Sequence, residues 1–497
     1  MFCPVFTCCP RPAATCLPFT VEYRGEKGNV VVAVRDIKPF ETILLDKPAI
    51  IGPFDDTKPQ CLECYSEVSV SGYKCSRCNL PLCGPECEDG PNHAPECKVL
   101  QAASPPISIE DDDSAHPVYA AVASIRMLHV MRTKPEVWQQ VDRLMDHLEG
   151  RRKEEKWSFV TDHVIPLITE RCGVACEPEL LERIIGIFRT NSVKWEDKSK
   201  GPCHPIGHAL CPLFSMMCHS CVNNTRYTQT MAGEMIVRAA KLIKKGEEIT
   251  IQYRGPNTGN ILRRPDFPTN WLFSCDCPRC VDPTELGTMA STMRCSQCAS
   301  PSLLPATSEL DSVWRCTACN REEDHQNIVQ IVQILEMQLD AFPYSASPEE
   351  WEDLLKRFQL QLHDDHYLCM KAKRMLLQIY GAREGYKLDQ MSRELLDRKI
   401  DLCRNYIDIF TRLEPGYRVW KGRLLEELLG PLTITVNRDL EDEKINKMQY
   451  ILRYKEIVKM VKEAAQCRQF EERDSNDEVI GQFYQSWMKP LQVGGRD

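Results

Sequence analysis

Cysteines at short, repeated spacings are the residues of this chain best suited to do chemistry. The 497 residues include 27 cysteines, and 13 of them fall in C-x2-C or C-x-C pairs. Such pairs hold structural zinc in a reducing compartment and form disulfides in an oxidising one. The first residues lack the basic segment and apolar run of a secretory signal, so we expect the pairs to bind zinc.

The first cluster lies between residues 61 and 97 and supplies eight soft ligands. Eight ligands fill two tetrahedral zinc sites of four ligands each. A segment of about 40 residues cannot bury enough apolar surface to fold alone, so metal binding would supply its folding free energy. The expected ligands are Cys61, Cys64, Cys75, Cys78, Cys83, Cys87, His93 and Cys97.

Two further clusters follow nearer the C-terminus. The second consists of Cys275, Cys277 and Cys280 and lacks the fourth ligand that structural zinc requires. The third has the spacing of a zinc ribbon, with free surface thiols as the alternative, and its members are Cys295, Cys298, Cys316 and Cys319. Seven cysteines outside the clusters are expected to be buried packing residues, namely Cys172, Cys176, Cys203, Cys211, Cys369, Cys403 and Cys467.

Short strands and long helices must position these ligands. Residues 29–34 and 42–45 form β-rich runs, and residues 206–253 return to short strands that end in the run 248–253. Residues 116–195 have helical spacing, and so does the chain beyond Glu322. There, an apolar stripe predicts packing between helices and comprises Leu396, Ile400, Cys403, Ile407 and Phe410. Together the elements predict a multi-domain α+β fold.

Length and composition set the outer limits. The chain is too long for one core, so we expect about three domains. Its 43% hydrophobic and 27% charged residues are ordinary globular values, and no window approaches the ~18 apolar residues of a membrane span. A net charge of −9 argues against general nucleic-acid binding. With no compact basic run, we expect cytoplasmic residence, nuclear residence or both.

The N-terminal tail, residues 1–20, places four cysteines among prolines without any periodic pattern. We expect a frayed terminus, and a partial metal site or a lipid-modified tail are the alternatives. The cysteines are Cys3, Cys8, Cys9 and Cys16.

Several motifs resemble those of SET-domain lysine methyltransferases. Residues 215–224 (SMMCHSCVNN) resemble the pseudoknot motif N-H-S-C-x-P-N, and residues 244–253 (KKGEEITIQY) resemble the closing strand with its tyrosine. Residues 275–280 (CDCPRC) resemble the post-SET metal motif, and the β-run after Gly28 resembles the opening strands. The resemblance implies a β-rich SET domain with a pseudoknot.

The order of the segments is similar to that of the SMYD family, which joins a SET domain to a MYND zinc finger. The resemblance covers nearly the whole chain, and the extra ribbon suggests a diverged, arthropod-type branch. Residues 413–416 (LEPG) and the helices around them resemble the family's α-helical TPR-like domain. The implied order after the tail is a first SET part (21–55), the MYND finger (61–97), a linker and helical insertion (104–195), the SET core (200–255), a zinc-bound post-SET and ribbon segment (270–320) and the TPR-like domain (325–490).

The resemblance also implies an activity, the transfer of a methyl group from S-adenosylmethionine to a lysine of a histone or other protein. Tyr253 matches the tyrosine that orients the amine and lines a dry channel, which helps the amine to lose its proton. Phe273 would stack on the adenine of the cofactor. The residues at cofactor-binding positions are Asn29, Asn191, Ser215, Cys218, His219 and Phe273. Cys221 matches the cysteine that completes the post-SET zinc site.

The MYND resemblance implies interleaved zinc sites and a partner role. One ion would be held by Cys61, Cys64, Cys83 and Cys87, and the other by Cys75, Cys78, His93 and Cys97. Such fingers bind short peptides, whereas DNA binding is disfavoured here because acidic residues outnumber basic ones around the finger. The substrate would be a lysine-bearing protein or peptide. The C-terminal helices could form a peptide groove or simply roof the substrate cleft.

Three departures from the motifs surround the expected cofactor site. Cys218 stands where the motif has asparagine, Val30 replaces a glycine, and Val222 with Asn223 replaces an acidic residue and a proline. A thiol hydrogen-bonds weakly, so losing one or two good bonds costs about 1–3 kcal/mol, roughly 5- to 150-fold in affinity. Two hypotheses follow: an active lysine methyltransferase, or a catalytically weak or inactive SET/MYND scaffold that recruits partners, for example in transcriptional regulation.

Overall fold

The computed structural model describes residues 17–113, 116–197, 205–230, 233–300 and 302–468. The predictions for the four cysteines of the N-terminal tail and for Cys203 lie outside these residues, as does the end of the expected C-terminal domain. Within them, no helix combines the length and apolar character needed to cross a membrane.

Three small antiparallel sheets form the centre of the N-terminal half. The first is a hairpin of β1 (Phe19–Tyr23) and β2 (Asn29–Ala33), which confirms the predicted β-run. The second has the order β3-β8-β7 and the third β4-β6-β5, so both pair strands from distant parts of the chain. Their bounds are β3 Thr42–Asp46, β4 Ile50–Gly52, β5 Val193–Glu196, β6 Pro205–Leu210, β7 Thr225–Gln229 and β8 Met235–Ala239.

The predicted strand over residues 248–253 is wrong as a regular strand. Ile249 donates its backbone N–H to Val31 (2.8 Å), whereas two residues later Ile251 donates to Cys218 (3.0 Å). Ser220 returns a hydrogen bond to Ile251 (2.9 Å), and residues 219 and 251 pair in parallel. The segment therefore changes partner half-way, which prevents a continuous ladder and places residues 218–220 beside the end of the hairpin.

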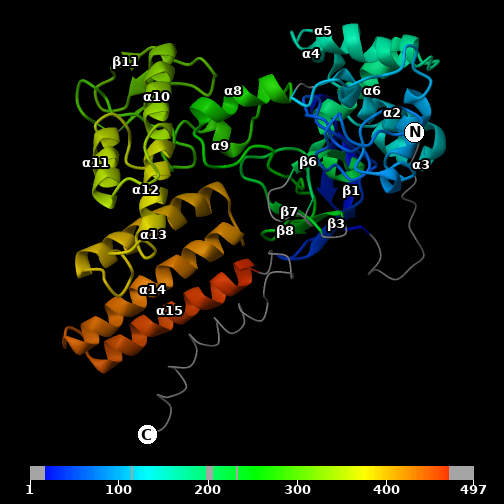
Figure 1. Ribbon diagram of the computed structural model, residues 1–497. Coiled ribbons are helices and arrows are strands. Elements are labelled where there is room, and N and C mark those ends of the chain that lie inside the picture. Colours follow the sequence, from blue (N-terminus) through cyan, green and yellow to red (C-terminus); the bar gives the residue numbers. More distant parts are fainter. Residues whose placement is uncertain (1–16, 114–115, 198–204, 231–232, 301, 469–497) are drawn as a thin grey trace.

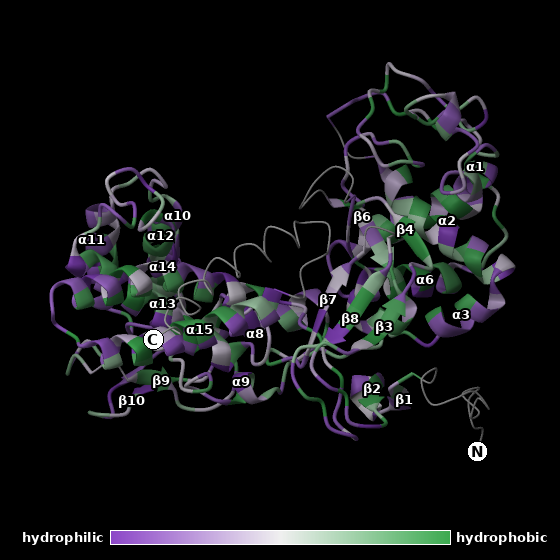
Figure 2. Ribbon diagram, turned by 90° about the horizontal axis from the view of Figure 1, so that it is seen from below, coloured by the Kyte–Doolittle hydropathy of each residue, from purple (hydrophilic) through white to green (hydrophobic). Residues whose placement is uncertain are grey.

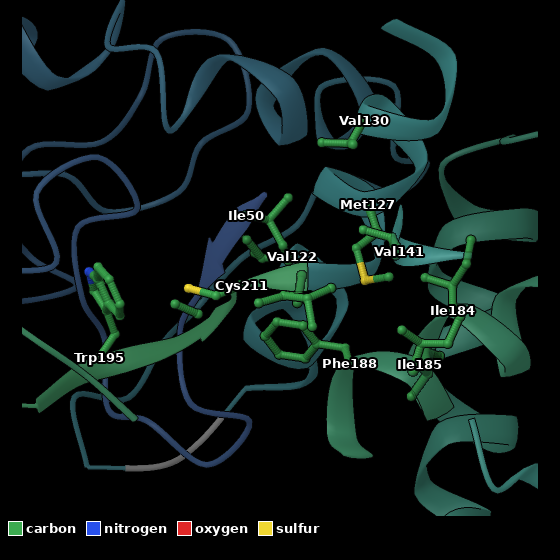
Figure 3. Packing of buried hydrophobic residues seen from close by; sticks show 14 of the residues in the cluster. Ile50, Val122, Met127, Val130, Val141, Ile184, Ile185, Phe188, Trp195 and Cys211 are labelled. Carbon is green, nitrogen blue, oxygen red and sulfur yellow. The ribbon is translucent and has the colours of Figure 1, made fainter. Parts of the chain in front are cut away.

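A helical layer covers the sheets, as the spacing of residues 116–195 predicted. The segment's apolar side chains pack against the third sheet, and in Figure 3 Val122 and Phe188 meet near Ile50. Burying each such side chain contributes about 1.5–3 kcal/mol. The segment consists of α2 (Pro117–Thr133), α3 (Pro135–Val141), α4 (Leu148–Arg151), α5 (Trp157–Phe159), two π-helical turns (Val160–Val164 and Leu167–Arg171) and α6 (Pro178–Asn191).

The C-terminal half is a separate group of helices preceded by a small zinc-ribbon-like sheet (Figures 1 and 2). In this group α11 packs against α12, α13 against α14, and α14 against α15, and each helix carries both hydrophobic and hydrophilic residues (Figure 2). The elements are β9 (Leu303–Pro305), β10 (Trp314–Cys316), β11 (Glu322–Glu323), α10 (His325–Asp340), α11 (Pro348–Gln359), α12 (Tyr367–Ile379), α13 (Arg393–Leu413), α14 (Val419–Glu441) and α15 (Lys447–Arg468). All members of the predicted stripe lie on α13, and only Ile407 is not fully buried.

Two shorter helices connect the halves, and neither was predicted from the sequence. α8 (Asn260–Asn270) contains Pro265 and Pro268, which normally interrupt helices, so its residues gave no helical prediction. It lies between the sheets and the C-terminal helices in Figure 1, followed by α9 (Pro278–Val281). One packing prediction is also wrong: Cys176 is half-exposed because it lies in the loop before α6, while five of the other unclustered cysteines are buried.

Arg418 fastens the C-terminal helices to the second sheet. It is 3% exposed and donates to the carbonyls of Thr225 (2.7 Å) and Asn223 (2.8 Å) and to the Asn223 side chain (3.1 Å). Burial lowers the pKa of Arg418 to about 10, which still leaves the guanidinium charged at neutral pH. Beside it Gly416 has a φ of +92°, and a Cβ there would lie 2.3 Å from the Ala240 carbonyl oxygen. Only glycine allows this close approach.

Replacing Arg418 with alanine should loosen this junction. The substitution removes three hydrogen bonds to buried acceptors, so we expect a loss of about 3 kcal/mol in the free energy of unfolding. Urea unfolding and limited proteolysis around residues 414–419 measure the effect. The exposed Arg404→Ala, on the same helical group, is the matched control, and equal stability of the two variants would contradict this account.

Stability at acid pH should depend on His366, which caps α12. Its Nδ1 accepts from the Leu368 N–H (3.2 Å), and burial lowers its pKa to about 3, against about 6.5 in the unfolded chain. The unfolded state therefore takes up a proton as pH falls below 6.5, and the folded state does not. The stabilisation present above pH 6.5 is lost on the way to pH 3, roughly 2.7 kcal/mol of it by pH 4.5.

His366→Asn keeps a capping acceptor and has no proton to gain. Its stability should fall less between pH 7 and 4.5 than that of the parent protein. Chemical denaturation at the two pH values gives the loss of stability for each protein. Any effect of pH on the metal sites is the same in both proteins and drops out of the comparison. Parallel pH curves would show that His366 does not carry the effect.

Candidate active site and metal centres

Among the residues that the structure describes, four groups of cysteine and histidine side chains come together in space. In each group the four ligand atoms lie within 4.8 Å of one another. Neighbouring sulfurs are 3.3 Å apart for Cys64 and Cys83 and 3.6 Å apart for Cys298 and Cys316. Zn–S bonds of ~2.3 Å in a tetrahedron require sulfurs about 3.8 Å apart, so the donor sets fit zinc.

The structure assembles the groups as the sequence and the family resemblance predicted, the interleaved pairing of the finger included. Each group joins ligands from two separate stretches of the chain. In the group of Cys275, Cys277 and Cys280, the fourth member is Cys221. The groups are Cys61, Cys64, Cys83 and Cys87; Cys75, Cys78, His93 and Cys97; Cys221, Cys275, Cys277 and Cys280; and Cys295, Cys298, Cys316 and Cys319. Their role as ligands stays a prediction.

A buried ion pair behind the finger was not predicted. Glu96 and Arg126 are both buried, and Arg126 Nε donates to Glu96 Oε2 (2.9 Å) and Nη2 to the Leu62 carbonyl (2.8 Å). His93 Nδ1 lies 3.5 Å from Glu96 Oε1, while its Nε2 lies 3.6 Å from Cys78 Sγ among the ligands. A carboxylate behind a ligating imidazole fixes its orientation. The H-x2-E spacing, one helical turn, was the available signal.

Buried charged side chains also surround the Cys221 group. Arg263, Arg279 and Glu285 are fully buried there, and Arg263 Nε donates to Cys221 Sγ (3.3 Å). Arg279 Nε donates to Glu285 Oε2 (2.9 Å). Hydrogen bonds from the three neighbouring thiols lower the pKa of Cys221, which favours its thiolate form. This sulfur is therefore prepared to bind a cation.

Tyr253 and His219 lie next to this group. The Tyr253 hydroxyl donates to the Met217 carbonyl (2.9 Å), and its backbone N–H donates to His219 Nδ1 (2.9 Å). Burial raises the pKa of Tyr253, so the phenol stays protonated. Ring contacts join His219, Tyr253 and Phe273 with Phe267 and Trp271 in one aromatic cluster, at centroid distances of 4.6–6.3 Å. The cluster contains three of the predicted site residues.

Two predicted cofactor residues, Asn29 and Asn191, bind the loop between α3 and α4. Asn29 Nδ2 donates to the Arg143 carbonyl (2.6 Å), and Asn191 Nδ2 donates to the Met145 carbonyl (2.7 Å). Gly28, at φ +67°, faces the same loop, and an added Cβ would lie 3.0 Å from Met145 Sδ. The sequence gave no signal for residues 143–145, because their role comes from backbone carbonyls and not from side-chain type.

Ser215 and Cys218 join this region to His219. Ser215 Oγ donates to the Asn191 carbonyl (2.8 Å), whereas Cys218 Sγ makes one weak contact, 3.9 Å to the Asn29 carbonyl. Burial raises the pKa of Cys218 to about 11, so it remains a thiol. The motif residues 215–219 thus touch the other predicted cofactor residues, and Cys218 is the one with the poorest contact.

Asp46 binds the backbone just before the motif residues 215–219, a role that was not predicted from the sequence. Its Oδ2 accepts from the N–H groups of Leu213 and Phe214 (both 2.9 Å) at the start of α7 (Pro212–Ser215). Burial raises the pKa of Asp46 to about 6. An acidic residue at the end of an apolar strand was the only sequence signal.

Comparison with known proteins finds a family model and several relatives that match this chain. Residues 95–254 match the family model described as the SET domain. The SET domain-containing protein SmydA-8, isoform A, of Drosophila melanogaster is 27% identical over 323 residues, which cover 63% of this chain and 67% of the relative. The chain thus contains a match to the SET domain and is similar to proteins named for the SMYD family. The arthropod relative agrees with the expected branch.

Other relatives of this chain carry enzyme names. The histone-lysine N-methyltransferase ASHR1 of Arabidopsis thaliana is 22% identical over 440 residues, covering 82% of this chain and 86% of the relative. The N-lysine methyltransferase SMYD2 of Gallus gallus is 26% identical over 217 residues, covering 42% and 47%. The similarity thus extends beyond the SET domain to most of the chain.

The four ligand groups of the described residues should carry four zinc ions, one in each group. Cys221→Ser should leave three, because a serine hydroxyl is a poor replacement for a thiolate. Mass spectrometric metal analysis of the purified protein gives the count. Cys176→Ser, at a half-exposed cysteine outside the groups, should retain all four. Fewer than four ions in the parent protein, or no loss from Cys221→Ser, would contradict the assignment.

Proposed function

We propose that the chain is a protein-lysine N-methyltransferase that uses S-adenosylmethionine. The observation that carries the proposal is the meeting of Tyr253, His219 and Phe273 in one aromatic cluster beside Cys221, at positions that match the SET family. The match of residues 95–254 to the SET domain supports it, as do relatives named as lysine methyltransferases.

The residues around the cluster fit the cofactor. Asn29, Asn191, Ser215 and His219 present amide, hydroxyl and imidazole groups, and Phe273 presents a half-buried ring for an adenine. The tight backbone at Gly28 leaves its neighbour Asn29 close to the loop carbonyls. When bound, S-adenosylmethionine supplies an activated methyl group on a sulfonium centre.

Tyr253 would hold the lysine amine for in-line attack. Its half-buried ring packs against Trp271 and Phe273, so the amine would lie among aromatic surfaces with little water. Deprotonating a lysine of pKa ~10.4 at pH 7 costs roughly 4.6 kcal/mol, and a dry site lowers that cost by disfavouring the ammonium. The protonated phenol, fixed on the Met217 carbonyl, would contact the amine through its oxygen.

The three departures from the SET motifs differ in their expected effect on cofactor binding. Val30 is fully buried, and strand alternation puts it on the face opposite Asn29, away from the loop at residues 143–145. Asn223 is buried and accepts from Arg418, so it serves the junction with the C-terminal helices. Only Cys218 lies among the candidate cofactor residues, and its single 3.9 Å contact favours weakened cofactor binding over an abolished site.

The same contact supports a second candidate, a weak or inactive SET/MYND scaffold. In that case the finger would bind peptide partners and the C-terminal helices would hold others. Under either candidate we propose a pseudoknot formed by residues 218–220 and 249–253, a TPR-like arrangement of α10–α15, and the domain division given by the family resemblance. We further propose a lysine-bearing protein substrate and cytoplasmic or nuclear residence.

Tyr253→Phe should separate the two candidates. Loss of the orienting hydroxyl should lower methyl transfer to protein substrates by roughly 100-fold if the chain is an enzyme. Incorporation of a radiolabelled methyl group from S-adenosylmethionine into cell protein is the measurement. Tyr227→Phe removes a nearby hydroxyl that makes a long hydrogen bond to the Gln252 carbonyl (3.4 Å), and should leave the rate unchanged. No transfer by the parent protein would favour the scaffold.

Cys218→Asn should strengthen cofactor binding. An amide in place of the thiol restores one or two hydrogen bonds, so the affinity for S-adenosylmethionine should rise about 5- to 150-fold. Calorimetric titration of the zinc-loaded parent and variant gives both values. Cys211→Ser, at a buried cysteine outside the ligand groups, controls for a general effect of losing a thiol. Equal affinity in parent and Cys218→Asn would show that Cys218 does not limit binding.

A further inference from the structure

His219 touches both the candidate zinc site and the catalytic tyrosine. One ring nitrogen, Nδ1, lies 2.9 Å from the Tyr253 backbone nitrogen, and the other, Nε2, lies 3.2 Å from Cys221 Sγ. Among the described residues, no other side chain hydrogen-bonds both a member of the Cys221 group and Tyr253. The His219 ring therefore links the Cys221 group directly to Tyr253.

The chemistry of the two contacts fixes the tautomer of this ring. A backbone N–H can only donate, so Nδ1 must accept the hydrogen bond from Tyr253 and cannot carry a proton. The ring proton is then on Nε2, which donates it to the sulfur of Cys221. The sulfur accepts this bond best as a metal-bound thiolate, because a thiol is a weak acceptor.

Arg263 is the second donor to the same sulfur. Its Nε lies 3.3 Å from Cys221 Sγ, and its Nη2 lies 3.9 Å from Cys280 Sγ. Four thiolates around one Zn²⁺ leave a net charge of −2, which is costly to bury. The fully buried guanidinium offsets part of that charge and fixes the sulfur that His219 contacts.

We propose that His219 is a positioning residue through which the zinc-bound sulfur of Cys221 holds Tyr253 in place, with Arg263 steadying that sulfur. The zinc site then regulates the geometry of the tyrosine in addition to stabilising the fold. The proposal rests on the proposed function only where it calls Tyr253 catalytic, since the three contacts exist without any methyl transfer. Zinc loss at this one site would release the His219 ring and displace the Tyr253 backbone.

The amide signal of Tyr253 tests the proposal without an activity assay. The chain has 15 tyrosines, so selective 15N-tyrosine labelling gives a small set of amide signals, and the one missing in Tyr253→Phe is assigned. Cys221→Ser should shift this signal. Cys298→Ser, which removes a ligand from the ribbon group, should cost one zinc ion and leave the signal in place. An unmoved signal in Cys221→Ser, or equal shifts in both variants, would overturn the proposal.

Two more variants keep the test decisive if Cys221→Ser does not fold. Arg263→Gln retains all four ligands, and loss of its donors should speed zinc release to a chelator by roughly 10- to 100-fold and shift the same signal. His219→Asn keeps an acceptor at the position of Nδ1 but no longer reaches the sulfur, so adding Arg263→Gln to it should cause no further shift. Independent, additive shifts would overturn the link through His219.

The outcomes also separate this proposal from the proposed function. If the signals move as expected but no methyl transfer is found, the link from zinc to Tyr253 stands and the enzyme assignment fails. If methyl transfer is found but the Tyr253 amide signal does not shift in Cys221→Ser or Arg263→Gln, the link from zinc to Tyr253 fails and the enzyme assignment stands.

Discussion

The candidate active site depends on the contacts that the sulfur of Cys221 makes. It belongs to the segment 215–224, yet its partners in the metal group lie 54 to 59 residues further along the chain. A metal ion here would close a loop that contains Tyr253 and α8, and would hold Phe273 in the aromatic cluster around His219. Few fully buried apolar residues surround the group, so the ion would add to the hydrogen bonds of Arg263 and Arg279 and to the aromatic contacts that hold this segment in place.

Buried arginines hold the other junctions by a common mechanism. Arg126 joins the finger to α2, Arg279 joins the post-SET segment to the loop after Tyr253, and Arg418 joins the C-terminal helices to the second sheet. Each donates to backbone carbonyls of residues in loops or at the start of a strand. The guanidinium suits this task because it offers five donors and stays charged when buried. Removing one would leave several buried acceptors unsatisfied.

The ligand groups and the order of segments could be predicted because both follow local spacing and motif order. The contacts that complete the site could not. Arg126, Arg263 and Arg418 look like surface residues in the sequence, and their burial depends on which carbonyls the tertiary fold leaves free. The loop at residues 143–145 contributes main-chain oxygens, which no residue type reveals. The run 248–253 was mistaken for a strand because its alternating pattern does not show that it changes partner half-way.

The central claim is that the zinc site at Cys221 assembles the cofactor site, and one comparison tests it directly. Calorimetry can measure S-adenosylmethionine binding to Cys221→Ser and to Cys298→Ser, two variants that each remove one ligand from a group of four cysteines. The account predicts that the parent protein and Cys298→Ser bind alike and that Cys221→Ser loses most of its affinity. Equal binding by both variants would contradict it.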